Sequence, residues 1–278
     1  MPVPPPGWRA HHHAVVAIAI VGAAGLALAA SGCGDSGAPP PSALTRAAKA
    51  DASYGVRYRY RGRSSEAGKK VYRLRGYAQT EADQRRSRIV VVGSDIRGEI
   101  IRDGHDEYNG GDLAGTALLG SSSSGIRWTK VDDARLLKAG YIDKVCGAEL
   151  PGKVAGALAR TGPRIERLGP ARVGGRPTTR YRVTTTYGKV LDTLAGNDDA
   201  ADCDARDRAA TFVADLWIDR DNLVRRVRVR SSLAGVSSVE TRDITGYDRD
   251  VSVAVPSGPA VADVTDRLLS LADGMKSE

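Results

Sequence analysis

Strict alternation between apolar and basic residues constrains the fold of this chain more than any other feature. The residues from Tyr54 to Arg61 read YGVRYRYR, with three tyrosines and a valine at every second position and arginines between the later ones. Successive side chains of a β-strand point to opposite faces of a sheet. The pattern therefore predicts a strand with one covered face and one face in water.

Similar patterns, separated by Gly, Asn and Asp turn signals, recur along the chain. Strands are predicted at residues 70–77, 86–92, 96–102, 105–109, 127–131, 165–168, 178–185, 211–219, 223–230, 236–247 and 251–255. Helices are predicted at residues 134–139, 150–160, 187–194 and 261–272, and a short helix is expected to begin within residues 42–50. The fold class is therefore α+β and mainly antiparallel β, with about ten or eleven strands. A twisted sheet of that size curls, and the helices are the natural cover for its inner face.

The N-terminal segment has the organisation of a secretory signal. Arg9 and three histidines precede an uncharged apolar run, Ala14 to Ala30, and the small residues Ser31 and Gly32 follow it. A basic start, an apolar stretch and a small-residue exit define such signals. The alternative is an uncleaved membrane anchor, because the run is near the lower limit of the roughly 17–25 residues that span a bilayer.

The residues Ala30-Ser31-Gly32-Cys33 resemble the lipobox of bacterial lipoproteins, although Ala30 stands where leucine is usual. The resemblance implies cleavage after a signal peptide at residues 1–32 and diacylation of Cys33. Two acyl chains make a durable membrane anchor. We therefore expect an extracytoplasmic protein, lipid-anchored to the cell membrane in the periplasm or on the outer surface, with a flexible tether at residues 33–50.

Charge and cysteine content fit that compartment. The chain has 41 Lys and Arg against 33 Asp and Glu. Export argues against nucleic acid as a partner, so the basic balance points to anionic lipid head groups or a cell-wall polyanion. Cys146 and Cys203 remain once Cys33 is set aside. An even pair in an exported domain predicts a disulfide, and two separate buried thiols are the alternative.

Catalytic machinery is sparse. His105 is the one histidine that remains after the signal, so multi-histidine metal sites are excluded from the mature chain and only one Ser-His-Asp arrangement is formally open. The sequence has no CxxC, phosphate-binding glycine loop or G-x-S-x-G. We expect no enzyme activity, no metal and no cofactor.

Several segments together resemble the lipoprotein carriers of the LolA and LppX/LprG type. They are SYGVRYRYRG, IERLGPARVGGRPTTRYRV, LWIDRDNLVRRVRV and ITGYDRDVSVAVPSG, together with the lipobox and the tether. The resemblance implies a curled, unclosed β-barrel at residues 51–258 with helices covering the concave face, where the family holds acyl chains. A C-terminal helix at residues 259–278 is less typical of the family.

The apolar strand faces are either plain core or the wall of a lipid cavity. The candidate wall residues are Val56, Tyr58, Tyr60, Leu74, Val91, Ile100, Trp128, Leu216, Ile218 and Val227. The arginines on the opposite faces, such as Arg59 and Arg228, either bind anionic head groups or are simply solvated.

Two functions follow from these alternatives. The first is a monomeric lipoprotein that binds acyl chains of a lipid or glycolipid for carriage within the cell envelope, with an envelope transporter or another lipoprotein as partner. The second is an envelope interaction or sensor module with a filled core and no lipid cargo.

Overall fold

The computed structural model describes residues 42–66, 71–93, 96–114, 125–139, 154–195, 208–233 and 236–276. Cys33, Cys146 and Cys203 lie outside these residues, so the expected acylation and disulfide stay predictions. The strands are β1 Gly55–Glu66, β2 Val71–Thr80, β3 Arg86–Val92, β4 Arg97–Asp103, β5 Asp106–Gly111, β6 Trp128–Asp132, β7 Arg164–Val173, β8 Arg176–Thr186, β9 Thr211–Ile218, β10 Val224–Leu233, β11 Val236–Asp248 and β12 Val261–Asp263. The helices are α2 Ala43–Asp51, η1 Asp112–Ala114, α3 Asp133–Lys138, α4 Val154–Arg160, α5 Tyr187–Ala195, η3 Gly258–Ala260 and α7 Thr265–Lys276.

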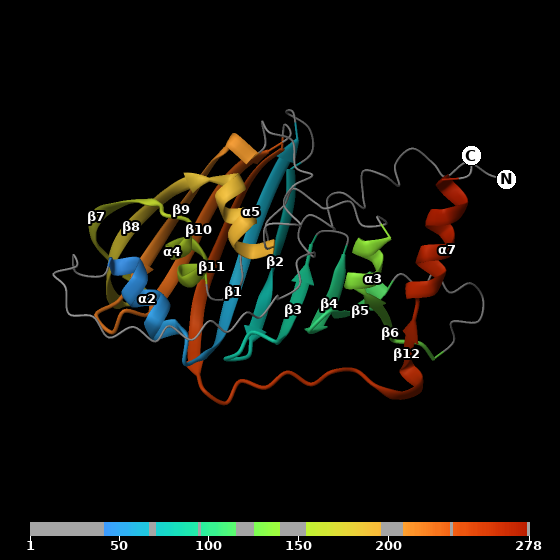
Figure 1. Cartoon of the computed structure of the whole chain (residues 1–278). Helices are drawn as coiled ribbons and strands as arrows, with labels where there is room; N and C mark the ends of the chain where they lie inside the picture. Colours follow the sequence, from blue (N-terminus) through green and yellow to red (C-terminus); the bar gives the residue numbers. More distant parts are fainter. Residues whose placement is uncertain are drawn as a thin grey trace, which may run out of the picture.

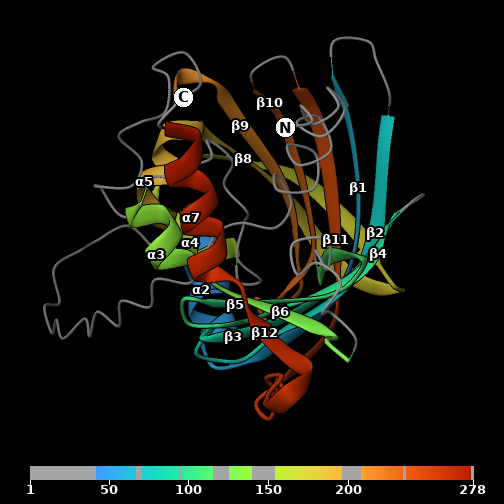
Figure 2. The same cartoon turned by 90° about the vertical axis from the view of Figure 1, so that its right-hand side faces the viewer.

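All twelve strands form one sheet, in the order β12-β6-β5-β4-β3-β2-β1-β11-β10-β9-β8-β7. Strands β1 to β6 and strands β7 to β11 follow their chain order as two antiparallel groups, and β1 pairs with β11 to join them. The sheet curls around the helices, which lie on its concave side (Figures 1 and 2). This arrangement confirms the expected fold class of an unclosed, helix-covered barrel.

Tight turns set the register where the sequence predicted them. Gly174 and Gly175 join β7 to β8 with φ angles of 55° and 79°, which side chains with a Cβ rarely adopt. Between β9 and β10, the Asp219 carboxylate accepts the backbone N–H groups of Asp221 and Leu223 at 2.9 and 3.0 Å. Asn222 completes this turn with a φ of 61°, a left-handed conformation that asparagine tolerates.

The N-terminal boundary differs from the expected tether only in part, because the sequence also predicts a short helix within residues 42–50. Residues 43–51 form α2, and the Ser42 hydroxyl accepts the Thr45 N–H at 3.1 Å as its N-cap. Leu44 and Ala47 of α2 are buried in the core. The residues from Ser42 onward therefore belong to the fold, and any flexible tether ends before them.

The C-terminal boundary also differs. The predicted helix at residues 261–272 begins instead at Thr265, because Val261–Asp263 forms β12 and pairs in parallel with β6. Among the described residues, the predicted strand at 251–255 has no ladder partner. Val251 and Val253 are buried and Val255 is half-buried, so their alternation reflects packing rather than sheet pairing.

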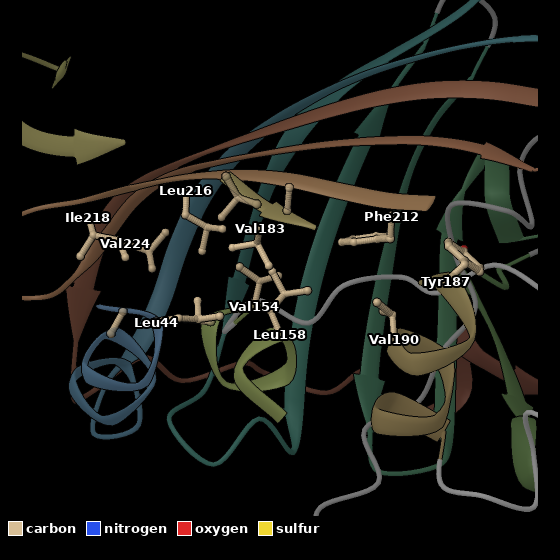
Figure 3. Close-up of a cluster of buried hydrophobic side chains, with 14 residues drawn as sticks. Leu44, Val154, Leu158, Val183, Tyr187, Val190, Phe212, Leu216, Ile218 and Val224 are labelled. Atoms are coloured by element: carbon tan, nitrogen blue, oxygen red, sulfur yellow. The ribbon is translucent and has the colours of Figure 1, made fainter. Parts of the chain in front are cut away.

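Most of the helical cover lies over one half of the sheet. Side chains of α2, α4 and α5 meet the inner face of β8, β9 and β10 in a buried apolar group that we call cluster 1 (Figure 3). Its buried members are Leu44, Ala47, Val154, Ala155, Leu158, Val183, Tyr187, Val190, Phe212, Ala214, Leu216, Ile218, Val224 and Val227. Burial of these side chains fixes the helices to the sheet.

Candidate functional site

Strand register brings nine of the ten predicted wall residues to one face of the sheet. Directly paired residues in neighbouring strands share a face. One such row crosses six strands and contains Leu216, Val227, Arg242, Tyr60, Gly76 and Val91. Because Leu216 and Val227 contact the covering helices in cluster 1, this face is the concave one (Figure 3).

Trp128 is the predicted wall residue that lies elsewhere. Trp128 pairs with Gly110, and Gly110 pairs with Glu99, so these three residues share one face of the sheet. Glu99 is adjacent to the concave residue Ile100 on β4, and adjacent residues of a strand point to opposite faces. The Trp128 side chain is therefore on the convex face. There it packs against a small buried group of Ile101, Tyr108 and Val253, which we call cluster 3. The structure therefore does not bring Trp128 together with the other nine residues.

The nine concave residues divide between two groups. Leu216, Ile218 and Val227 belong to cluster 1, beneath the helices. The others belong to or pack against a second group, cluster 2, on β1, β2, β3, β4 and β11. Its buried members are Val56, Tyr58, Tyr60, Ala78, Ile89, Val91, Ile100 and Ile244, with Leu74, Leu113 and Tyr247 packed against them. Within the described ranges, α2 to α7 supply no side chain to cluster 2.

The Tyr60 ring in cluster 2 lies over Gly76, the residue paired with it on β2. Its hydroxyl donates a 2.9 Å hydrogen bond to the Val90 carbonyl, reaching across β2. A Cβ at Gly76 would lie 2.8 Å from the Tyr60 ring, so only glycine leaves room for this crossing. The buried hydroxyl is thus satisfied within the sheet, and Tyr60 presents an apolar ring.

One ion pair interrupts the concave apolar face between the two clusters. Arg242 is 4% exposed, its Nε donates to Glu240 at 2.5 Å, and its guanidinium lies 5.3 Å from the ring centroid of Tyr58. Sequence reasoning missed this pair. The signal was present, because Glu240, Arg242 and Ile244 alternate on β11 and so share a face with Tyr58 and Tyr60.

A second polar group lies at the far end of the same face. Arg102 donates from Nε and Nη2 to Glu107 at 3.0 and 2.9 Å, and Asn109 donates to the other Glu107 oxygen at 2.9 Å. Nearby, burial and then the charge of Glu107 raise the pKa of Asp133 to about 7. Asp133 is the first residue of α3, and its backbone N–H donates to the His105 carbonyl, which joins that helix to the β4–β5 turn.

The arrangement suits binding better than bond-breaking chemistry. An apolar wall with a few fixed polar groups is typical of a ligand site. His105 is exposed in the β4–β5 turn, where its backbone carbonyl accepts the Asp133 N–H at 3.0 Å. Among the described residues, no three His, Cys, Asp or Glu side chains gather as metal ligands. In the same part of the chain, no helix combines the length and the apolar character needed to cross a membrane.

No protein-family model matches the chain, and no curated protein matches its sequence. Solved structures of the class that the sequence resembles do match. The lipoprotein LppX of Mycobacterium tuberculosis is 12% identical with a TM-score of 0.42, over 76% of this chain and 96% of that one. LprF of Mycobacterium bovis is 9% identical with a TM-score of 0.39, over 78% and 96%. A LolA superfamily protein of Nitrosomonas europaea is 11% identical with a TM-score of 0.30, over 78% and 96%.

Proposed function

We propose that this chain is an extracytoplasmic lipoprotein that binds acyl chains of a lipid or glycolipid against cluster 2 and carries them within the cell envelope. The observation behind the proposal is the composition of that cluster. It is a continuous apolar wall on the concave face, and the described helices that fill the space above cluster 1 contribute nothing to it.

The dimensions of cluster 2 fit an acyl chain. It extends across five adjacent strands from β11 to β4, which at about 4.8 Å between strands is roughly 19 Å. A bilayer core of about 30 Å contains two leaflets, so one acyl layer is about 15 Å deep. Each CH₂ kept out of water contributes about 0.8 kcal/mol, so cluster 2 can shield a chain from water once it has left the bilayer.

The anchor is part of the same proposal. Diacylated Cys33, exposed after removal of residues 1–32, holds the domain at the membrane that supplies its cargo. An envelope transporter or a second lipoprotein is the partner that delivers or receives the lipid. No catalytic step is required, because transfer of the acyl chain from bilayer to protein exchanges one apolar environment for another.

One observation favours the alternative, an interaction or sensor module without cargo. The core members of cluster 2 are 1–9% exposed, so they are covered in the structure without ligand. An acyl chain must therefore displace whatever covers them, whereas a filled core needs no such change.

Native mass spectrometry with lipid extraction separates the two functions. Residues 34–278 are produced in an oxidising bacterial compartment and purified without detergent. If the protein is a lipid carrier, phospholipid or glycolipid should co-purify at near one molecule per protein. A folded protein with a clean lipid-free mass would establish the interaction module instead.

A further inference from the structure

The convex face of the sheet carries a dense group of arginines that the cargo function does not use. Cross-strand pairing places them side by side on β2, β1 and β10, and β11 lies between the last two. We call this group the arginine patch. It consists of Arg59, Arg61, Arg63, Arg73, Arg75, Arg226, Arg228 and Arg230.

Like charges face one another directly within the patch. Arg61 pairs with Arg75, and Arg63 pairs with Arg73, across the β1–β2 ladder. Like charges placed directly opposite destabilise a sheet. All four side chains are exposed. The guanidinium groups of the β1–β2 hairpin therefore repel one another, and a bound anion would reduce this repulsion.

Acidic residues neutralise only part of this charge. Asp215 is shared by Arg180, Arg182 and Arg230 at 2.7–3.0 Å, and Asp243 pairs with Arg226 and, at 3.9 Å, with Arg61. Within the described ranges, Arg63, Arg73 and Arg75 make no ion pair with an acid. Among the described residues, the buried Nε of Arg228 finds no hydrogen-bond partner.

An exposed aromatic residue adjoins the patch. Tyr77 is the one large apolar side chain classed as exposed in the described residues, at 45%, and it pairs directly with Arg59. Tyrosine favours the boundary between lipid and water, because its ring is apolar and its hydroxyl is polar. Arginine binds phosphate groups through its planar set of donors. The two residue types together fit a phospholipid surface better than a soluble polyanion.

We propose that the arginine patch docks the protein on the anionic phospholipid head groups of the membrane. In this orientation the convex face lies against the bilayer surface and the helix-covered concave face points away from it. The docking is independent of whether cluster 2 holds a lipid, since the two surfaces lie on opposite faces of the sheet.

Vesicle co-sedimentation tests the docking. The mature chain carrying Cys33→Ser, which lacks an acyl anchor, is mixed with phosphatidylcholine vesicles with or without phosphatidylglycerol. Binding is expected only with phosphatidylglycerol and should weaken as ionic strength rises. The variant Arg61→Gln/Arg63→Gln/Arg73→Gln/Arg75→Gln should weaken that binding by roughly tenfold or more, since each basic residue near the surface adds to the attraction.

A matched variant removes the same charge elsewhere. Arg85, Arg220, Arg249 and Arg267 are exposed and lie outside the patch, so their joint change to glutamine should leave vesicle binding nearly intact. The patch variant should unfold at the same temperature as the parent or higher, because it loses two repulsive pairs. Equal loss of binding in both variants would overturn the proposal in favour of net charge alone. Retention of soluble polyphosphate binding without vesicle binding would also overturn it.

Discussion

The hydroxyl of Tyr60 on β1 reaches across the whole of β2 to donate to the backbone carbonyl of Val90 on β3. The crossing requires Gly76 between them, because a Cβ there would collide with both the Val90 oxygen and the Tyr60 ring. Three neighbouring strands are thus fastened by one side chain within the candidate lipid wall.

Gly76→Ala should therefore destabilise the fold severely, by about 3 kcal/mol or more, since Tyr60 must leave its position and expose an apolar ring. Tyr60→Phe should cost only about 1 kcal/mol, the usual worth of one hydrogen bond. Urea unfolding measures both. Gly246→Ala is the control on β11, where a Cβ meets nothing within 4 Å. Equal effects at Gly76 and Gly246 would contradict the account.

Two adjacent valines on β3 test the lipid wall. Val91 faces cluster 2, whereas Val90 pairs with Tyr77 and Glu99 on the convex face. Val91→Trp should sharply reduce the lipid that co-purifies, because the indole occupies the space of the acyl chain. Val90→Trp should leave the lipid content unchanged. Lipid extraction with quantitative mass spectrometry gives the comparison, and thermal unfolding confirms that both variants fold.

If the cluster is a filled core, Val91→Trp instead lowers stability through overpacking, by about 1–3 kcal/mol, and there is no lipid to lose. A folded Val91→Trp protein that keeps its lipid at the parental level would exclude cluster 2 as the binding wall.

Asp215 should be the most sensitive acidic residue on the convex face. Its side chain is wholly buried, which favours the neutral acid, but hydrogen bonds from Arg182, Arg180 and Arg230 outweigh burial and lower its pKa to about 2. The stabilisation is present above the ordinary pKa near 4 and is lost as pH falls through about 2. Asp215→Asn should cost about 3 kcal/mol or more at neutral pH, because three arginines then converge without a counter-charge.

Urea unfolding at a series of pH values checks this prediction, and the gap between parent and variant should shrink as the solution approaches pH 2. Asp221→Asn, at an exposed position in the β9–β10 turn, should change stability by no more than about 0.5 kcal/mol. A pH-independent gap would show that the Asp215 charge is not what stabilises this face.

Asp133 should have the opposite pH dependence. Burial and the charge of Glu107 raise its pKa to about 7, so the folded protein holds a proton that the unfolded chain releases near pH 4. The resulting stabilisation is complete below about pH 4 and is lost as pH rises through about 7. Asp133→Asn should remove this dependence and be more stable than the parent above neutrality, by about 2 kcal/mol.

Thermal unfolding from mildly acidic to mildly alkaline pH measures the effect. The parent melting temperature should decline across the range relative to that of Asp133→Asn. Asp250→Asn, at an exposed turn position after β11, should follow the parent curve. Parallel curves for parent and Asp133→Asn would show that Asp133 titrates normally.

Local patterns predicted the strands well. Residues 86–92 form β3 with the predicted bounds, and the alternation around Tyr58 gave β1 its correct inner face. These signals are short-range, because each strand's own side chains decide which face is covered. The number of such strands predicted a curled, helix-covered sheet, whereas the unclosed barrel was implied by the resemblance to a known family.

Long-range relations could not be predicted in the same way. Trp128 lies on a five-residue strand, and a shift of one residue reverses every side chain, so its face depends on β5. Val261 and Val264 have helical spacing, yet pairing with β6 makes Val261–Asp263 a strand. Arg242 is buried because Tyr60 and Val227 flank it from β1 and β10, which are distant in sequence.

The pairing of β1 with β11 has a consequence for how the chain matures. Gly55 meets Asp248 and Glu66 meets Val236, so the central ladder of the sheet joins residues from opposite ends of the domain. A contact of such high sequence separation forms slowly, and each half exposes an unpaired strand edge until it does. A chain that emerges N-terminus first, as in the proposed export, cannot complete this ladder until residue 248 has emerged. Until then the half-formed sheet keeps an open edge that other chains can pair with, so this topology favours a folding factor that shields β1.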